Sequence, residues 1–464
     1  MVDEQALYTI SPLDGRYATM VEPLTEYVSE AALMRARTRV EAEYLIALSD
    51  HDDIPISITE QTRIQLRKIY QEFDTDDAKR IKKIETEGTE TYPATNHDVK
   101  AIEYFLRSQL PNHLNPWIHF GLTSEDVTNI AYRILIRDAL TDILIPSITQ
   151  ITDQLIDFAH VYADTPMVAK THGQPASPTT FGKEMAVFAS RLIKNLQDLQ
   201  QAVEGMEAKF SGATGTYAAH TIAIQGVNWR AFAADFVTRF DMSLVEPTTQ
   251  INPGDDINRI FNALQYIHAV LLDLDRDMWE YIQNNYLHQT SKPSETGSST
   301  MPHKINPIDF ENSEGNLAKA NTDLDFIGDY ITTSRLQRDL SDSTVKRNMG
   351  AALGHSLIGY EKLSAGLSKI EPNEEKMLND LHETPEVITE AIQTILRREG
   401  ETNAYEIIKD QTRGESITLE ELHSIIDTMD IQEDTKEELR ALTPAKYTGL
   451  AAELAESIER QNNT

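Results

Sequence analysis

Residues 256–281 read DINRIFNALQYIHAVLLDLDRDMWEY, and this stretch is the most informative part of the sequence for the fold class. Its apolar side chains recur in steps of three and four without a miss, at Ile257, Ile260, Leu264, Ile267, Leu271, Leu274, Met278 and Tyr281. Because an α-helix turns once in about 3.6 residues, this spacing places them along one helical face. The stretch predicts a long amphipathic helix with a seam like that of a coiled coil.

Two further stretches repeat this pattern. Residues 183–210 carry it at Met185, Phe188, Leu192, Leu196, Leu199, Val203 and Met206, and residues 138–161 at Leu140, Leu144, Ile148, Ile151, Leu155 and Phe158. Pro146 is expected to kink the second helix, because proline removes a backbone donor. Several helices of this length predict an all-α fold with a central long-helix bundle. Seams this long commonly pack against other subunits, so we expect a homo-oligomer.

The chain of 464 residues is too long for one ordinary core. Two segments with prolines interrupt the helical patterns, LPNHLNP at 110–116 and SKIEPNEEK at 368–376. We therefore expect an N-terminal helical domain at 1–112, a central helical-bundle domain at 113–365 and a C-terminal helical domain at 366–464.

Composition excludes several classes of function. The formal net charge of -32 disfavours nucleic acid and anionic membranes as partners, because its field repels polyphosphate. Cysteine is absent, which excludes disulfides, thiolate nucleophiles and cysteine-bound metals and fits a cytoplasmic location. The first residues lack an apolar leader and no run of about 18 apolar residues occurs, so we expect no export and no membrane span. The acidity fits either a well-solvated oligomer or adaptation to high salt.

The stretch GSSTMPHKINP, residues 297–307, lies between helical patterns and contains the residues that end helices. It predicts a loop whose hydroxyls, backbone N–H groups, Lys304 and Asn306 suit a carboxylate ligand. A flexible connector is the alternative. The stretch closely resembles the signature loop of the fumarase/aspartase superfamily, whose members release fumarate from a succinyl group.

Further segments resemble the adenylosuccinate lyase family within that superfamily, as does His303 in the signature loop. They are SPLDGRY at 11–17, TNHDVK at 95–100, THGQPA at 171–176 and SRLQRDLSDSTVKRN at 334–348. The resemblance spans nearly the whole chain and is nearest to the bacterial branch. It implies a three-domain, all-α homotetramer whose active sites combine segments from different subunits, and a reaction that needs no cofactor and no metal.

A β-elimination requires an acid, a base and donors for the developing negative charge. Histidine has the side-chain pKa nearest neutrality, and the resemblance assigns His172 as the general acid. It implies Ser298 as the general base, with Ser299 as the obvious alternative. An unassisted hydroxyl is a weak base, so activation must come from backbone donors, from Lys304 or from loop closure.

The resemblance implies a small nucleotide substrate: adenylosuccinate, giving AMP, and the succinylated aminoimidazole carboxamide ribonucleotide (SAICAR), giving AICAR. Lys304, Ile305 and Asn306 would bind its carboxylate end, and Arg16, Tyr17, Arg338, Ser343, Thr344 and Arg347 its nucleotide and phosphate end. By the same resemblance, substrate is also bound by Asn96, His97, Asp98, Thr123, Ser124, Gln250, Ser299 and Asn312. For an arginine outside such a motif, a surface ion pair is the simpler interpretation.

Other features leave alternatives open. The Gly-rich stretch 211–217 could cradle a carboxylate or form an ordinary turn between helices. The segment from Glu85 to Ala94 is longer and more acidic than the family pattern, and its role is open. Metal-binding spacings such as HEXXH are absent from the sequence. The rival functions are another fumarate-releasing lyase, such as argininosuccinate lyase or aspartase, and a non-catalytic helical scaffold.

Overall fold

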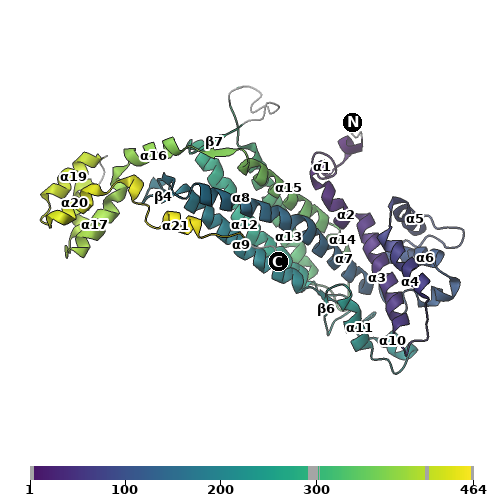
Figure 1. The fold of residues 1–464 in the computed structure, drawn as a ribbon. Coiled ribbons are helices and arrows are strands. Elements are labelled where there is room, and N and C mark those ends of the chain that lie inside the picture. The colour runs from purple at the N-terminus through teal and green to yellow at the C-terminus, as the bar shows by residue number, and fades with distance from the viewer. Residues whose placement is uncertain (1–4, 291–300, 302–303, 413–416, 461–464) are drawn as a thin grey trace. The chain divides into compact units, whose positions relative to one another are not determined.

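The computed structural model describes residues 5–290, 301, 304–412 and 417–460 (Figure 1). The α-helices are α1 (Ala18–Val21), α2 (Thr25–Val28), α3 (Glu30–Asp50), α4 (Glu60–Gln71), α5 (Thr75–Thr86), α6 (Asp98–Gln109), α7 (Ser124–Ala139), α8 (Ile145–Val161), α9 (Phe181–Glu204), α10 (Ala218–Ala223), α11 (Trp229–Thr238), α12 (Asp255–Gln283), α13 (Ile308–Ile331), α14 (Ser341–Lys346), α15 (Met349–Leu367), α16 (Glu374–Glu383), α17 (Thr389–Arg398), α18 (Ala404–Thr412), α19 (Leu419–Thr428), α20 (Glu433–Ala441) and α21 (Ala451–Glu456). Short 3₁₀ helices are η1 (Gln5–Tyr8), η2 (Glu22–Leu24), η3 (Asn112–Trp117), η5 (Pro385–Ile388) and η6 (Pro444–Lys446), and η4 (Leu140–Leu144) is a π-helix.

The strands are short and pair only in twos among the described residues. They are β1 (Pro166–Met167) with β4 (Thr179–Thr180), β2 (Lys170–Thr171) with β3 (Gln174–Pro175), β7 (Leu287–Gln289) with β8 (Ile370–Pro372), all antiparallel, and β5 (Glu207–Ala208) with β6 (Ser243–Leu244), parallel. Helices dominate the rest, so the expected all-α class is confirmed.

The chain forms two compact units, which we call unit 1 and unit 2. Unit 1 comprises Met1–Ser147, Asn195–Ala269 and Gly315–Gly359, and unit 2 comprises Ile148–Lys194, Val270–Glu314 and Tyr360–Thr464. This division follows contacts within the fold. The three domains expected from the sequence stay a prediction.

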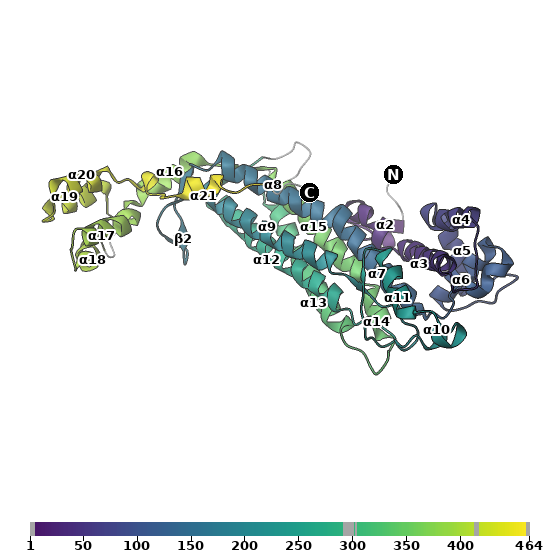
Figure 2. The same ribbon diagram turned by 60° about the horizontal axis from the view of Figure 1, so that its bottom comes forward.

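One core of unit 1 lies among α3, α4, α5 and α6, which are neighbours in Figures 1 and 2. Helix α3 begins where the side chain of Ser29 accepts a hydrogen bond from the backbone N–H of Ala32, a normal N-cap. Most of α3 is buried, including the charged side chains of Arg37, Glu41 and Glu43. Arg37 pairs with Asp98 and Glu43 with Arg67, and Glu41 contacts the imidazole of His119.

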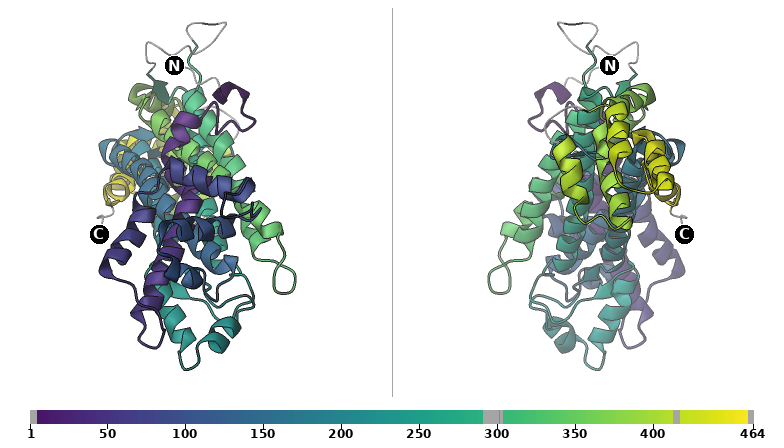
Figure 3. Two further views of the ribbon diagram at one scale, coloured as in Figure 1. Left: turned by 90° about the vertical axis from the view of Figure 1, so that its right-hand side faces the viewer. Right: turned by 90° about the vertical axis from the view of Figure 1, so that its left-hand side faces the viewer.

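In unit 2, helices α17 to α20 form a core of their own around Ile388, Ile392, Leu422 and Ile426. Figure 3 looks onto these helices in its right-hand view. They belong to the C-terminal part of the chain, where the sequence places its third domain.

The long helices follow the apolar patterns of the sequence, with differences at their ends. The seam at 256–281 is confirmed by α12, which runs from Asp255 to Gln283. The helix expected over 183–210 ends at Glu204, because Gly205 follows and glycine is costly inside a helix. The helix expected over 138–161 consists of the π-helix η4 followed by α8. The helix is therefore irregular at 140–144, just before Pro146, where the sequence predicts a kink.

Candidate active site

His172 lies at the tip of a two-residue β-hairpin in unit 2. Thr171 pairs with Gln174, so His172 and Gly173 form the turn, with φ of 54° and 72°. Positive φ at both positions is typical of a type I′ turn, whose twist matches the flanking strands. His172 is exposed, and Figure 2 shows the hairpin projecting away from the helices. The imidazole is therefore presented outward.

The base of this hairpin is attached to the end of α12. The Nζ atom of Lys170 donates a hydrogen bond to Oδ1 of Asn284 at 3.1 Å and lies 5.7 Å from the centroid of the Tyr286 ring. These contacts support the strand that leads to His172.

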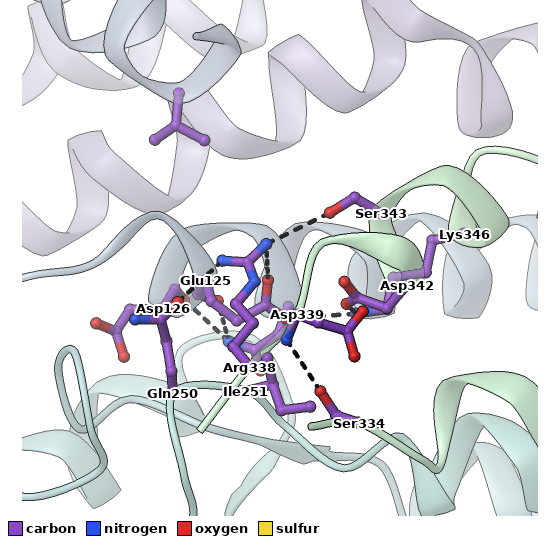
Figure 4. Close-up of polar contacts among 12 residues, drawn as sticks. Glu125, Asp126, Gln250, Ile251, Ser334, Arg338, Asp339, Asp342, Ser343 and Lys346 are labelled. Carbon is purple, nitrogen blue, oxygen red and sulfur yellow. Dashed lines mark hydrogen bonds and ion pairs between the residues drawn. The ribbon is translucent and has the colours of Figure 1, made fainter. Parts of the chain in front are cut away.

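Arg338, Gln250 and Ser343, all predicted substrate residues, come together in unit 1 (Figure 4). Nη1 of Arg338 donates to Oε1 of Gln250 at 3.3 Å, and Nη2 donates to Oγ of Ser343 at 3.3 Å. The second nitrogen also lies 3.7 Å from Oε2 of Glu125. The guanidinium is thus oriented from three sides, in the planar geometry that suits phosphate.

Glu125 and Lys346 extend this cluster, and sequence reasoning missed both. Nζ of Lys346 lies 2.7 Å from Oδ2 of Asp342 and 3.4 Å from Oε1 of Glu125, and all three side chains are buried. Buried charges require such partners. Lys346 stands inside the quoted run 334–348, but only the fold distinguishes it from a surface lysine.

Thr123 and Ser124 lie at the start of α7. Thr123 is the N-cap residue, and its backbone N–H donates to Oδ2 of Asp126 at 2.8 Å. Ser124 is the first helical residue. A helix N-terminus carries partial positive charge, so this position suits a carboxylate of the succinyl portion that the family resemblance assigns to Thr123 and Ser124.

The Gly-rich stretch 211–217 does cradle a carboxylate, but it is that of Asp126. Oδ1 of Asp126 accepts from the backbone N–H groups of Ser211 at 2.9 Å and Gly212 at 3.2 Å. It also accepts from Nζ of Lys209 at 2.6 Å, and both charged side chains are fully buried. Neither Asp126 nor Lys209 was expected at the site.

The loop before Thr123 packs on a second buried group that the sequence did not reveal. The hydroxyl of Tyr44 donates to the carbonyl of Phe120 at 2.7 Å and lies 3.2 Å from Nε2 of His220. Burial lowers the pKa of His220 to about 4, so the ring is neutral at physiological pH. A Cβ atom on Gly121 would lie 2.7 Å from the His220 ring, so the loop approaches it as closely as glycine allows.

Asn96, His97 and Asp98 mark the start of α6. His97 is the N-cap residue, with Nδ1 accepting from the backbone N–H of Lys100 at 3.3 Å. Arg37 donates to Oδ2 of Asp98 at 2.8 Å, and Arg347 lies 3.4 Å from the same oxygen.

Burial would raise the pKa of Asp98, but the charge and hydrogen bond of Arg37 hold it below the usual value. The carboxylate is therefore ionised at neutral pH. The structure joins two predicted substrate residues here, Asp98 and Arg347.

The remaining candidates of unit 1 are placed more simply. The guanidinium of Arg16 lies 6.0 Å from the ring centroid of Tyr17, and Arg16 is exposed. Thr344 lies in α14, where its carbonyl accepts from Nδ2 of Asn348 at 3.1 Å.

The signature loop is described in part. Ser298, Ser299 and His303 lie outside the described residues. Lys304 and Ile305 are exposed and belong to no helix or strand, as expected of a loop, and the carbonyl of Ile305 accepts from Nε2 of Gln289 at 3.2 Å. Asn306 is half-buried before α13, and Asn312 lies in its first turns.

Within the described ranges, no group of histidine and carboxylate side chains has the arrangement of a metal site. Nor does any described helix have the length and apolarity to cross a membrane. The cytoplasmic location stays a prediction.

Comparison with known proteins adds independent findings. Residues 15–321 match a family described as lyase, and residues 334–448 match the adenylosuccinate lyase C-terminal family. Adenylosuccinate lyase of Legionella pneumophila (strain Corby) is 42% identical over 460 residues, covering 98% of this chain and 99% of the relative. Adenylosuccinate lyase of Escherichia coli (strain K12) is 40% identical over 462 residues, covering 98% and 99%.

Solved structures agree at the level of the fold. A 3-carboxy-cis,cis-muconate lactonizing enzyme from Pseudomonas putida matches with a TM-score of 0.73 at 20% identity, over 94% of this chain and 95% of that one. A fumarate lyase from Mesorhizobium sp. BNC1 matches with a TM-score of 0.74 at 17% identity, over 94% and 96%. With nearly full-length similarity to curated relatives and matches to both family regions, the chain belongs to the adenylosuccinate lyase family of the fumarase/aspartase superfamily.

Proposed function

We propose that this lyase cleaves adenylosuccinate to AMP and fumarate, and SAICAR to AICAR and fumarate, in purine nucleotide synthesis. The observation that carries the proposal is the similarity over 98% of the chain to proteins named adenylosuccinate lyase. The oriented guanidinium of Arg338 supports it, because the substrate carries a phosphate.

In the proposed reaction Ser298 removes the proton next to a succinyl carboxylate. The electron pair forms the double bond of fumarate as the carbon–nitrogen bond breaks, and His172 protonates the leaving nitrogen. Lys304 and Asn306, with Thr123 and Ser124 at the N-terminus of α7, would bind the charge that develops on the carboxylate.

The other candidate residues would bind the nucleotide and complete the pocket. Arg338, Ser343, Thr344 and Arg347 lie at or beside α14 and would contact the phosphate. We assign the same general role to Arg16, Tyr17, Asn96, His97, Asp98, Gln250, Ser299, Ile305 and Asn312.

We further propose a homotetramer with active sites shared between subunits. The outward position of His172 supports this, because an exposed histidine needs neighbouring groups to bind and desolvate a substrate. Mixing inactive His172→Gln and Ser298→Ala proteins under conditions of subunit exchange should restore part of the activity. Absence of recovery despite demonstrated exchange would contradict shared sites.

The function itself is tested with purified protein and each substrate separately. Chromatography should detect AMP from adenylosuccinate and AICAR from SAICAR, each with an equal amount of fumarate. Fumarate from argininosuccinate or aspartate instead would show the rival lyase function. Fumarate from none of these substrates, with the protein folded, would leave the non-catalytic scaffold.

A further inference from the structure

Asp126 and Lys209 form a buried ion pair that the proposed chemistry does not use. Both side chains are fully buried, and Nζ of Lys209 also donates to the carbonyl of Gly212 at 2.5 Å. The carboxylate accepts three backbone N–H groups besides, those of Thr123, Ser211 and Gly212. The pair thus holds two loops that are far apart in the sequence.

The first of these loops carries the predicted succinyl-binding residues. Oδ2 of Asp126 accepts a hydrogen bond at 2.8 Å from the backbone N–H of Thr123, the residue before α7, and so fixes its position. Any shift of the carboxylate would move Thr123 and, with it, the neighbouring hydroxyl of Ser124.

The second loop is connected to the nucleotide side of the site. The carbonyl of Ala213 accepts from Nε2 of Gln250 at 2.9 Å, and Oε1 of Gln250 accepts from Arg338 at 3.3 Å. A Cβ atom on Gly215 would lie 2.1 Å from the carbonyl of Thr248, so the Gly-rich loop packs directly against the segment that carries Gln250. The chain of contacts runs from Lys209 to Arg338.

We infer that Lys209 and Asp126 are positioning residues, which set the spacing between the succinyl end and the phosphate end of the substrate site. This inference rests on the proposed function. The pair touches neither end directly: Asp126 acts on Thr123, and Lys209 acts through the Gly-rich loop, Gln250 and Arg338. A site that must hold both ends of one molecule gains from a rigid connection between them.

Stability alone does not account for such a pair, because buried ion pairs contribute little net stability compared with apolar residues. Unit 1 offers a matched comparison in Arg133 and Asp256, which are also buried and 2.6 Å apart. Oδ2 of Asp256 accepts the backbone N–H of Glu207, so this carboxylate too has a backbone donor. The second pair includes none of the predicted substrate residues.

The test compares Lys209→Met with Arg133→Met. Each change removes one buried cation and leaves a carboxylate with backbone donors. The backbone at position 209 keeps both hydrogen bonds to the Asn129 side chain, at 2.9 and 2.8 Å, which favours a folded variant. We expect similar losses of melting temperature in the two variants.

The distinguishing measurements are the dissociation constants for AMP and for fumarate. Lys209→Met should weaken the binding of AMP about 10-fold, the factor expected for the loss of one charge-assisted hydrogen bond. It should weaken the binding of fumarate as well. Arg133→Met should change both dissociation constants by less than about 2-fold, because Arg133 and Asp256 bind Asn129 and Glu207 and contact neither Thr123 nor the Gly-rich loop. Equal effects in the two variants, or unchanged binding in Lys209→Met, would overturn the inference.

A double-mutant cycle tests the route through Gln250. If Lys209 affects AMP binding through the side chain of Gln250, then Lys209→Met should weaken AMP binding much less in a Gln250→Ala background than in the wild type. Effects that simply multiply would contradict this route. Because AMP binding is measured directly, a wild-type protein that binds AMP without cleaving adenylosuccinate would refute the proposed function and leave this test intact.

Discussion

Arg338 in unit 1 and His172 in unit 2, both predicted site residues, lie in opposite surroundings. In unit 1, Arg338 is held by Gln250, Ser343 and Glu125, and the buried charges nearby have opposite partners. In unit 2, His172 stands exposed on a hairpin tip, and Lys304 is exposed as well.

The two arrangements match the two parts of the proposed reaction, binding of the phosphate and protonation of the leaving nitrogen. A phosphate is bound best by donors that are already oriented, and Arg338 is oriented by its neighbours. The acid needs only a correct approach to the substrate, and a short turn can provide that. Substitutions at four positions test this contrast.

The largest effect is expected from His172→Gln. Loss of the general acid should lower turnover by about 10²- to 10⁴-fold, while AMP affinity and melting temperature stay near those of the wild type. Steady-state kinetics and calorimetry would measure this. His113→Gln is the control, since His113 is exposed and outside the site motifs. Near-normal turnover in His172→Gln would refute the assignment.

Arg338→Gln should act on binding instead. Removal of charge-assisted hydrogen bonds to phosphate should weaken the binding of AMP by about 10- to 100-fold and raise KM, whereas kcat should change less. Arg335→Gln is a matched control, because Arg335 lies three residues before it in the same segment between α13 and α14, is 79% exposed and pairs with Asp339. If both variants bind AMP equally well, the phosphate is bound elsewhere.

How far the sequence could predict this molecule differs between its features. The seam of α12 was located within two residues at each end, because helical periodicity is a local property. The pairing of Lys209 with Asp126 joins residues 83 apart, so no local pattern shows it. In the sequence, Lys209 is one more lysine, and only its position in the fold makes it a buried cation.

The Gly-rich loop shows the same limit. Its ability to bind a carboxylate could be inferred from the composition of residues 211–217, because glycine exposes backbone N–H groups. That the carboxylate belongs to Asp126 depends on the packing of α7. Backbone chemistry was predictable, and the identity of the partner was not.

Asp275 sharpens the contrast within unit 2, because it is buried without the partners that unit 1 provides. Neither carboxylate oxygen has a hydrogen bond of good geometry among the described residues. Burial raises the pKa of Asp275 well above 3.8, and the nearby side chain of Ser313 offsets only part of this shift. The folded protein therefore keeps a proton that the unfolded chain releases above about pH 4, so this group's contribution to stability is lost as pH rises.

Asp275→Asn should accordingly stabilise the protein by roughly 1–3 kcal/mol at about pH 8 and by much less near pH 4. Urea unfolding at the two pH values would measure it. Asp273→Asn is the control, as Asp273 is 53% exposed and pairs with Arg191. A gain that does not depend on pH would contradict a protonated Asp275.

The smallest effect is expected from Gly173→Ala. The added methyl group would meet no atom within 4 Å, so the loss of folding free energy comes from the backbone φ of 72° and is about 1 kcal/mol. A turn strained in this way should lower kcat several-fold and leave AMP affinity unchanged. Gly226→Ala, also at positive φ in open space but in unit 1, should leave kcat unchanged. Equal kcat in both variants would mean that the turn does not orient His172.

The complete burial of Lys209 has a consequence for chemical labelling. The Lys209 amine has no exposed surface and lies 2.6 Å from a carboxylate, so acylating reagents cannot reach it in the folded protein. Exposed amines react rapidly, such as that of Lys68, whose side chain is 60% exposed. Modification of Lys209 would then follow the opening of unit 1, and its rate would report how often that opening occurs. Peptide mass spectrometry over a labelling time course would measure the labelling rate of Lys209 and those of the surface amines in the same sample, and so the rate at which unit 1 opens.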